Sequence, residues 1–387
     1  MIASVNVQRT GKSILQMSVF LFLTAAIFAD FCLSYVPTPY IGVTLDTPRM
    51  QRKYYLDNLK LFLTLLVVFH HAAQPHMAGS YWPYHFAQES MIIPGIWRFT
   101  STNASFFMGL FFLIAGYFVP RSYDKQKAKT FVLKKIIHLG VPCAIMTTLI
   151  SCLMVHHFEI AHMWFIENLL FFSLLYALYR LIGKPLSNVR QRGASIWQML
   201  CVALLMGVVV HTVRQFYAQD EWIGLGGILF FEPARYGQYI IMFIVGIIAY
   251  RFDSFEKISR ITGLACLITG FILIVLNCTR FGITAHLINR YYGFIESLMS
   301  ITISFGLIWL FREYFNRTNR LVSWCCSQTL WVYVVHLPLM VCIQFAFDGM
   351  SMPPVPRLLF IGVVSTIISF FTAGLISWTI EHIRNNS

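Results

Sequence analysis

The stretch YYLDNLKLFLTLLVVFHH, residues 54–71, is a run of apolar residues with ionisable groups near both ends. Asp57 and Lys60 lie near its start, and His70 and His71 close it. Its length suits a helix in lipid, since the hydrocarbon core of a bilayer needs about 20 helical residues. A plain membrane anchor carries no such groups, because they are costly to bury in hydrocarbon. The stretch therefore predicts a transmembrane helix with a polar side that serves a function.

The composition of the whole chain is that of a membrane protein. Of its 387 residues, 57% are hydrophobic and 12% are charged, and the mean hydropathy is +0.66. Soluble domains carry about 25% charged residues, so the balance excludes an ordinary soluble enzyme. The net charge of +13 would suit a nucleic-acid-binding protein, but the basic residues are scattered over short linkers between apolar runs. We expect no nucleic-acid partner, since membrane topology accounts for this charge.

Apolar runs long enough for helices in lipid recur along the chain. They lie near residues 13–36, 58–78, 100–120, 131–155, 163–183, 195–213, 234–250, 258–277, 291–311, 321–345 and 356–380. The predicted fold class is therefore all-α, a polytopic membrane helix bundle of ten core spans with one possible extra N-terminal helix.

We divide the chain into an N-terminal extension, 1–49, and a ten-span membrane domain, 50–387. Residues 1–49 can be read as an extra transmembrane helix, as a signal-like segment or as an extension upstream of Met50, and the sequence leaves these alternatives open.

Charge alternates between successive linkers from residue 50 onward. The linker 121–135 is strongly basic, the next carries HHFEIAH at 156–162, and the one after it, 180–192, is basic again. Cytoplasmic loops of membrane proteins carry an excess of Lys and Arg. The alternation predicts that 121–135 and the C-terminus are cytoplasmic and that the loop 79–98 lies outside.

The ionisable groups of the first core span fall on one side of its predicted helix. Lys60 and His71 are eleven positions apart, which at 100° per residue brings them within about 20° of one line, and Asp57 and Thr64 lie near it. A rise of ~1.5 Å per residue separates Lys60 from His71 by roughly 16 Å. His70 points about 100° away. The structural alternative is a lysine that reaches the interface beside Asp57, with histidines satisfied by neighbouring helices.

This K-x10-H spacing with its YLDNLK lead-in resembles the first helix of acyltransferase family 3. The members are membrane O-acyltransferases that move acyl groups from acyl-CoA to extracytoplasmic glycans. Four further segments resemble the family in the same order: LFFLIAGYF (110–118), TFVLKKIIHLGVP (130–142), HMWFIENLLFFSLLY (162–176) and SQTLWVYVVHLPLM (327–340). The chain departs from the family where Lys60 replaces a frequent Arg and where Lys135-x-x-His138 replaces R-x-x-R.

The resemblance suggests how acyl transfer would be catalysed. An alcohol is a poor nucleophile until a base takes its proton. His71 is the expected base, because a histidine titrates near pH 6.5 and can later return the proton to the thiolate leaving group. Lys60 and Asp57 are the other catalytic candidates, on the cytoplasmic half of the path.

The basic start of segment 130–142 is implied by the resemblance to bind the donor. Lys135 and His138 are three apart on one helix face, and Arg121 lies at the end of the preceding apolar run. Cations at these cytoplasmic helix ends would bind the phosphates of acyl-CoA, the expected donor substrate. The positive-inside bias explains Arg121 equally well.

Three residues are candidates for substrate binding. Trp164 and Glu167 lie near the outer end of their predicted helix, where an acceptor sugar needs a stacking face and a hydrogen-bond acceptor. A tryptophan there is also typical of the membrane interface. His336 lies some fifteen residues into its apolar run, and the resemblance makes it a site residue; its structural alternative is a hydrogen bond to a backbone carbonyl.

The predicted function is an O-acyltransferase of the bacterial inner membrane that moves an acyl group, expected to be acetyl, from cytoplasmic acyl-CoA to a hydroxyl of a surface or periplasmic glycan or lipid-linked saccharide. The alternatives are a proton-coupled permease, which uses the same ionisable residues as a relay, and a transferase for succinyl or another longer group. His156, His157 and His162 match no zinc pattern, so no metal is expected. The sequence leaves the acyl chain, the acceptor sugar and the oligomeric state open.

Overall fold

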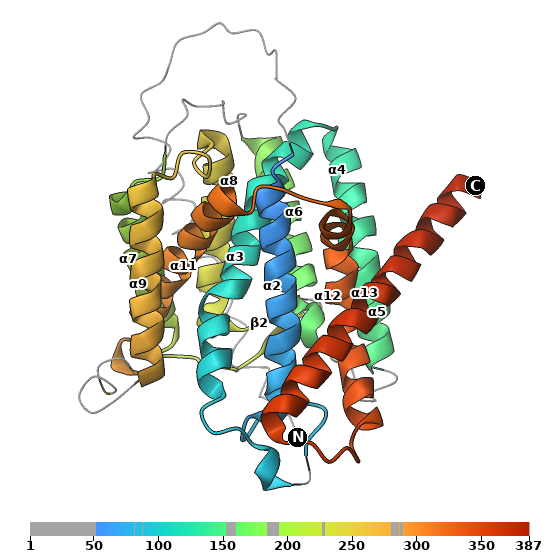
Figure 1. Ribbon diagram of the computed structural model, residues 1–387. Helices are drawn as coiled ribbons and strands as arrows, with labels where there is room; N and C mark the ends of the chain where they lie inside the picture. Colours follow the sequence, from blue (N-terminus) through green and yellow to red (C-terminus); the bar gives the residue numbers. More distant parts are fainter. Residues whose placement is uncertain are drawn as a thin grey trace, which may run out of the picture.

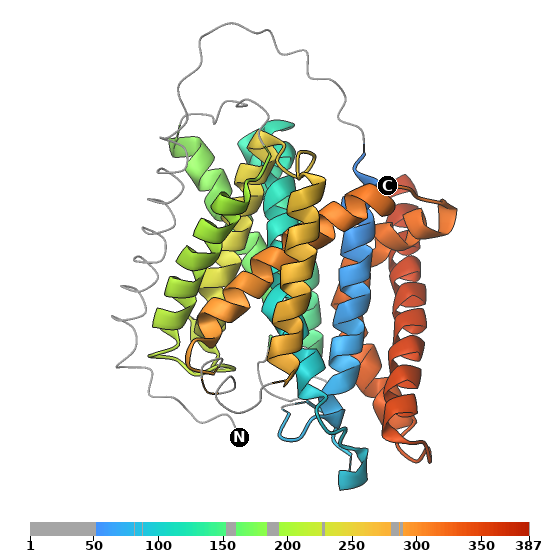
Figure 2. The same cartoon turned by 60° about the vertical axis from the view of Figure 1, so that its left-hand side comes forward.

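The computed structural model describes residues 52–386, except 81, 87, 152–159, 184–192, 227–228, 280–285 and 287–288. It is an all-α bundle of roughly antiparallel helices, with one short hairpin (Figures 1 and 2). The long helices are α2 (Tyr54–Ala73), α3 (Trp97–Asp124), α4 (Ala128–Lys135) continued by α5 (Val141–Ile150), α6 (Trp164–Ile182), α7 (Ile196–Val213), α8 (Pro233–Phe252), α9 (Arg260–Thr279), α11 (Tyr292–Tyr314), α12 (Arg320–Ala346) and α13 (Pro354–Asn386).

Each of the ten predicted core spans corresponds to a helix of the described chain, which confirms the predicted fold class. Within these residues, nine helical segments are long and apolar enough to cross a membrane. The tenth, α8, is less apolar, because it carries Arg235, Gln238 and Arg251. Most of its residues are nevertheless buried in the bundle. The predicted run 13–36 lies outside the described residues.

α3 and α8 form the centre of the bundle and pack backbone against backbone. A Cβ atom on Gly116 would lie 2.1 Å from the carbonyl oxygen of Phe243, and one on Gly246 would lie 2.1 Å from that of Leu113. Small residues let membrane helices approach this closely. The glycine in the segment LFFLIAGYF therefore fixes the distance between the two central helices.

One membrane helix contains a local irregularity. The residues Ile136–Gly140 form a π turn between α4 and α5, and Pro142 follows directly in the first turn of α5. Proline has no N–H and its ring crowds the carbonyl group four residues earlier, so the helix widens by a turn of this kind. The segment Ala128–Ile150 thus remains one continuous rod.

Charged groups gather at two ends of the bundle. We call the end where α2 begins the basic end; there the Lys53 ammonium pairs with Asp253 at 3.0 Å and Glu256 at 2.7 Å. We call the end where α2 finishes the histidine end; there Trp82 donates to the Gln344 amide oxygen at 2.6 Å. The charge pattern of the linkers predicts that the basic end is cytoplasmic.

The hairpin lies at the histidine end, just before α8. Its strands β1 (Ile223–Leu225) and β2 (Leu229–Phe231) are antiparallel, with Gly224 opposite Phe230. It holds the connection between α7 and α8 against the start of α6, so that Trp222 of this connection contacts Trp164.

Candidate active site

Three histidines from distant parts of the chain meet inside the bundle. The ring of His71, near the end of α2, lies 5.3 Å from the ring of His336 on α12, measured between centroids. The ring of His336 lies 4.9 Å from that of His162, which precedes α6. His336 and His162 are fully or almost fully buried, and His71 keeps some exposed surface. We call these three residues the histidine cluster.

Backbone carbonyl groups orient two of the three rings. His336 Nδ1 lies 2.7 Å from the carbonyl oxygen of Tyr333, and His162 Nε2 lies 3.0 Å from that of Val334. A ring nitrogen that faces a carbonyl oxygen must carry the proton, so in the neutral ring the other nitrogen is an acceptor. Those other nitrogens, and Nδ1 of His71, are buried without a hydrogen-bond partner among the described residues. The cluster can therefore accept a proton.

His71 and His70 face different surroundings, as their positions on the helix predict. The His71 ring stacks on Trp82 at 5.3 Å, and Trp82 is held in place by Gln344. The His70 ring lies 5.0 Å from Phe107, and its Nε2 lies 3.2 Å from the Gln74 amide nitrogen. His70 thus packs against α3, away from His336.

Lys60 and Asp57 form an ion pair at the basic end of α2. The Lys60 ammonium lies 2.8 Å from one Asp57 oxygen, and the Arg52 guanidinium lies 2.9 Å from the other. The ammonium also lies 5.1 Å from the centre of the Phe118 ring. The structure places Lys60 where it balances Asp57, and Arg52 leaves this three-residue group with one excess positive charge.

The predicted donor-binding residues do not all turn inward. Lys135 is half-buried, with its ammonium 5.5 Å over the ring of Phe131. His138 is exposed on the outer side of the same rod, and its Nδ1 lies 2.8 Å from the carbonyl oxygen of Lys134. Arg121 is half-buried near the end of α3. The structure therefore brings Lys135 and Arg121 to the bundle and leaves His138 at its surface.

Trp164 and Glu167 connect α6 to the hairpin. The Trp164 ring stacks on Tyr239 of α8 at 5.3 Å and meets the edge of Trp222 at 5.5 Å. The Glu167 carboxylate accepts a hydrogen bond of 2.9 Å from the backbone N–H of Phe230. Trp222 is 45% exposed, so an aromatic surface opens at this end of the molecule beside a carboxylate.

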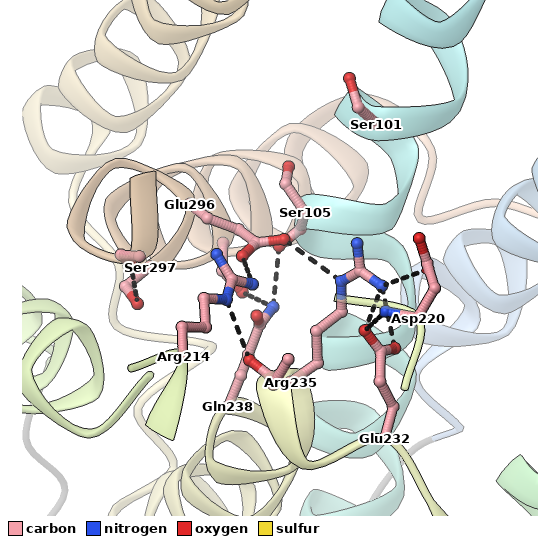
Figure 3. Close-up of polar contacts among 12 residues, drawn as sticks. Ser101, Ser105, Arg214, Asp220, Glu232, Arg235, Gln238, Glu296 and Ser297 are labelled. Atoms are coloured by element: carbon pink, nitrogen blue, oxygen red, sulfur yellow. Dashed lines mark hydrogen bonds and ion pairs between the residues drawn. The ribbon is translucent and has the colours of Figure 1, made fainter. Parts of the chain in front are cut away.

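A second polar group lies at the histidine end, between α3, α7, α8 and α11 (Figure 3). Arg235 donates to both oxygens of Glu232, at 2.7 and 2.8 Å, and lies 3.4 Å from Glu296. Glu296 also pairs with Arg214, and Gln238 donates to Ser105 of α3 at 2.8 Å. These contacts tie the four helices together, although no motif in the sequence joins them.

The sequence interpretation missed His162 and Trp82 as site residues. In the sequence, His162 stands out only within a histidine group that matches no zinc pattern, although it opens the segment HMWFIENLL that carries the resemblance. Trp82 lies in a loop with no pattern around it. Among the described residues, no group of three or more His, Cys, Asp or Glu side chains has a metal-binding arrangement.

Comparisons with known proteins place the chain in a family. A family model described as "Acyltransferase domain" matches residues 53–374. Proteins named "Glucans biosynthesis protein C" from Escherichia coli O9:H4 (strain HS) and from strain ATCC 8739 are each 22% identical over 332 residues, which covers 75% of this chain and 82% of theirs. The protein of the same name from strain K12 / DH10B is 22% identical over 330 residues, with the same coverage. No solved structure matches the chain.

Proposed function

This chain belongs to the acyltransferase family, and we propose that it moves an acetyl group from cytoplasmic acetyl-CoA to a glycan hydroxyl outside the bacterial inner membrane. The observation that carries the proposal is the histidine cluster: a buried set of proton acceptors on α2, α12 and the start of α6, with cations at the opposite end of α2. The acyl donor would enter from the basic end and the acceptor from the histidine end.

His71 is the proposed general base. His71 is the most exposed residue of the three, so a substrate hydroxyl can reach it. As the hydroxyl oxygen attacks the thioester carbon, the proton passes to His71; when the carbon–sulfur bond breaks, the proton returns to the thiolate. His336 and His162 act as positioning residues, since their rings border His71 and one another.

Lys60 and Asp57 are proposed to support the same path from its other end. Asp57 holds Lys60 and Arg52 together at the point where the anionic coenzyme would arrive. The group of three retains one positive charge, and the carboxylate keeps both long side chains ordered. Arg121, Lys135 and His138 remain proposed donor contacts at the same end.

The proposed acceptor is a glucan. The relatives are named for glucan biosynthesis, and sugars stack on aromatic rings such as those of Trp164 and Trp222. Glu167 completes the proposed acceptor contacts, and His336, which is fully buried, acts on the acceptor only through His71. A lipid-linked saccharide is a second form in which the same sugar could be presented.

The test is acyl transfer in membranes that contain the full chain. Labelled acetyl-CoA is supplied with a glucan acceptor, and the ester on the glucan is released by mild base and identified. His71→Gln should lower the rate by about 10² to 10⁴, the usual contribution of a general base. His70→Gln, one residue away on the same helix, is the matched control and should stay within a few-fold of the wild type at equal expression.

Three outcomes would change the proposal. Full activity in His71→Gln would exclude His71 as the general base. An ester formed from succinyl-CoA in place of acetyl-CoA would keep the mechanism and change the donor. Proton-driven solute uptake by the wild type, without any ester formation, would contradict the enzymatic function and show that the protein is a permease.

A further inference from the structure

Two arginines at the basic end share a single carboxylate. Arg180 of α6 places Nη1 2.8 Å from one oxygen of Asp124, and Arg251 of α8 places Nη1 3.0 Å from the other. The arginine side chains are 10% and 6% exposed, and Asp124 is 33% exposed. Two guanidinium groups against one carboxylate leave an excess positive charge in a largely buried position, which is costly unless something balances it.

The same arginines have donors that Asp124 does not use. Both also donate to the Tyr176 hydroxyl oxygen, at 2.8 Å from Arg180 and 3.0 Å from Arg251. Nε of Arg251 is buried without a hydrogen-bond partner among the described residues. A buried donor without a partner is rare in folded proteins and costs free energy. The arginine pair can therefore bind more acceptor oxygens than this carboxylate supplies.

An aromatic strip connects the arginine pair to Lys135. The Arg180 guanidinium lies 5.0 Å over the Tyr123 ring, and Tyr123 meets the ring of Phe131 at 5.2 Å. Phe131 in turn carries the Lys135 ammonium on its face. The arginines thus extend the proposed donor-binding surface from α4 across α6 to α8.

Asp124 is poorly stabilised by its own helix. It is the last residue of α3, where the partial negative charge of the helix dipole disfavours a carboxylate. Its charge is favoured at this position by the ion pairs with the two arginines. A ligand that offered the arginines more negative charge could displace it without unfolding the helix.

We propose that Arg180 and Arg251 bind a phosphate group of the acyl donor, and that Asp124 occupies the phosphate position until the donor arrives. A phosphate presents oxygens to a guanidinium in the same paired geometry as a carboxylate, with more negative charge and a further oxygen for Arg251 Nε. This inference rests on the proposed function, because it takes acyl-CoA as the donor. It adds two arginines and a displaceable carboxylate to the donor site.

The experiment measures coenzyme A binding to the purified full chain by calorimetry, and acyl transfer with two donors, acetyl-CoA and S-acetylpantetheine, which lacks phosphates. Arg180→Gln should raise Kd for coenzyme A and KM for acetyl-CoA by about 10- to 100-fold, the usual loss for a hydrogen bond to a charged group. The kcat with acetyl-CoA and the KM for S-acetylpantetheine should change less than threefold. Arg180→Lys should recover part of the loss.

Asp124→Asn separates this inference from a purely structural network. If the carboxylate competes with the phosphate, its removal lowers Kd for coenzyme A; if the network only holds three helices together, Asp124→Asn and Arg180→Gln raise Kd alike, and the inference is overturned. Arg312→Gln is the control at the same end: Arg312 donates to the carbonyl groups of Phe255 and Ile258 and should lower thermal stability without changing Kd.

Binding and transfer report on different proposals. Arginine-dependent binding of coenzyme A without any transfer would leave the phosphate site in place and contradict the proposed acyltransferase reaction. Transfer from acetyl-CoA with an unchanged Kd in Arg180→Gln would support the acyltransferase reaction and contradict the phosphate site.

Discussion

The contact between α3 and α8 predicts a large effect for one added methyl group. In Gly116→Ala, the new Cβ would lie 2.1 Å from the carbonyl oxygen of Phe243, whereas an ordinary contact needs 3.4 Å or more. The two helices must then move apart by about 1.3 Å, the difference between these distances. The obstructing atom belongs to the backbone, so no side chain can rotate away.

The sign of the net effect follows from two opposing terms. Replacing Gly by Ala inside a helix favours the helix by about 1 kcal/mol. Overpacking a well-packed core costs about 1–3 kcal/mol, and a clash between two backbones belongs at the upper end or beyond. We expect Gly116→Ala to destabilise the folded protein by about 2 kcal/mol, and to slow transfer because α3 also carries the residues around the donor site.

The assay is thermal unfolding of the detergent-purified protein, followed by fluorescence. Gly349→Ala is the matched control: a Cβ there meets nothing within 4 Å, so its melting temperature should equal that of the wild type. If Gly116→Ala melts at or above the wild-type temperature with normal yield, α3 and α8 are not packed as the structure has them, and the reasoning fails.

Three further predictions concern the two ends of the bundle. Glu296→Gln should lower stability by about 3 kcal/mol in a denaturation assay, because a buried guanidinium, above all that of Arg214, loses its carboxylate; a normal melt would contradict the pairing. Burial and a hydrogen bond to a carboxylate raise the pKa of Tyr84 to about 12, so its contribution to stability is complete below pH 10 and is lost as the pH rises toward 12. The melting temperature should therefore fall less between pH 9 and pH 12 in Tyr84→Phe than in the wild type. An impermeant thiol reagent should label a cysteine at Gln88 in intact cells and spare one at Lys127, and the opposite pattern would invert the topology.

Helix positions could be predicted closely because the bilayer fixes them. A span needs about 20 apolar residues whatever the fold, so the runs in the sequence locate the helices to within a few residues. The different directions of His70 and His71 follow from helix geometry alone. The π turn at Ile136–Gly140 could not be predicted, since a proline at 142 is equally compatible with a kink or with a helix start.

The site could be predicted only where one helix carries it. Lys60 and Asp57 are three positions apart, so their pairing was among the expected roles. His162 and His336 are 174 positions apart and meet only because the turn before α6 lies against α12. The same holds for Arg214, which directly follows α7, and Glu296 of α11. Contacts of this kind depend on tertiary packing, which no local pattern contains.

The distribution of charge explains why the proposed base is a histidine. Along α2, the ion pairs lie at the basic end, whereas the rings of His71, His336 and His162 contact other rings and backbone carbonyl groups. Three neutral imidazoles about 5 Å apart can take up one proton, but they repel a second, because like charges at this distance disfavour each other strongly away from water. In the proposed reaction the cluster therefore holds the acceptor's proton for a single turnover and must return it to the thiolate before the next hydroxyl can react.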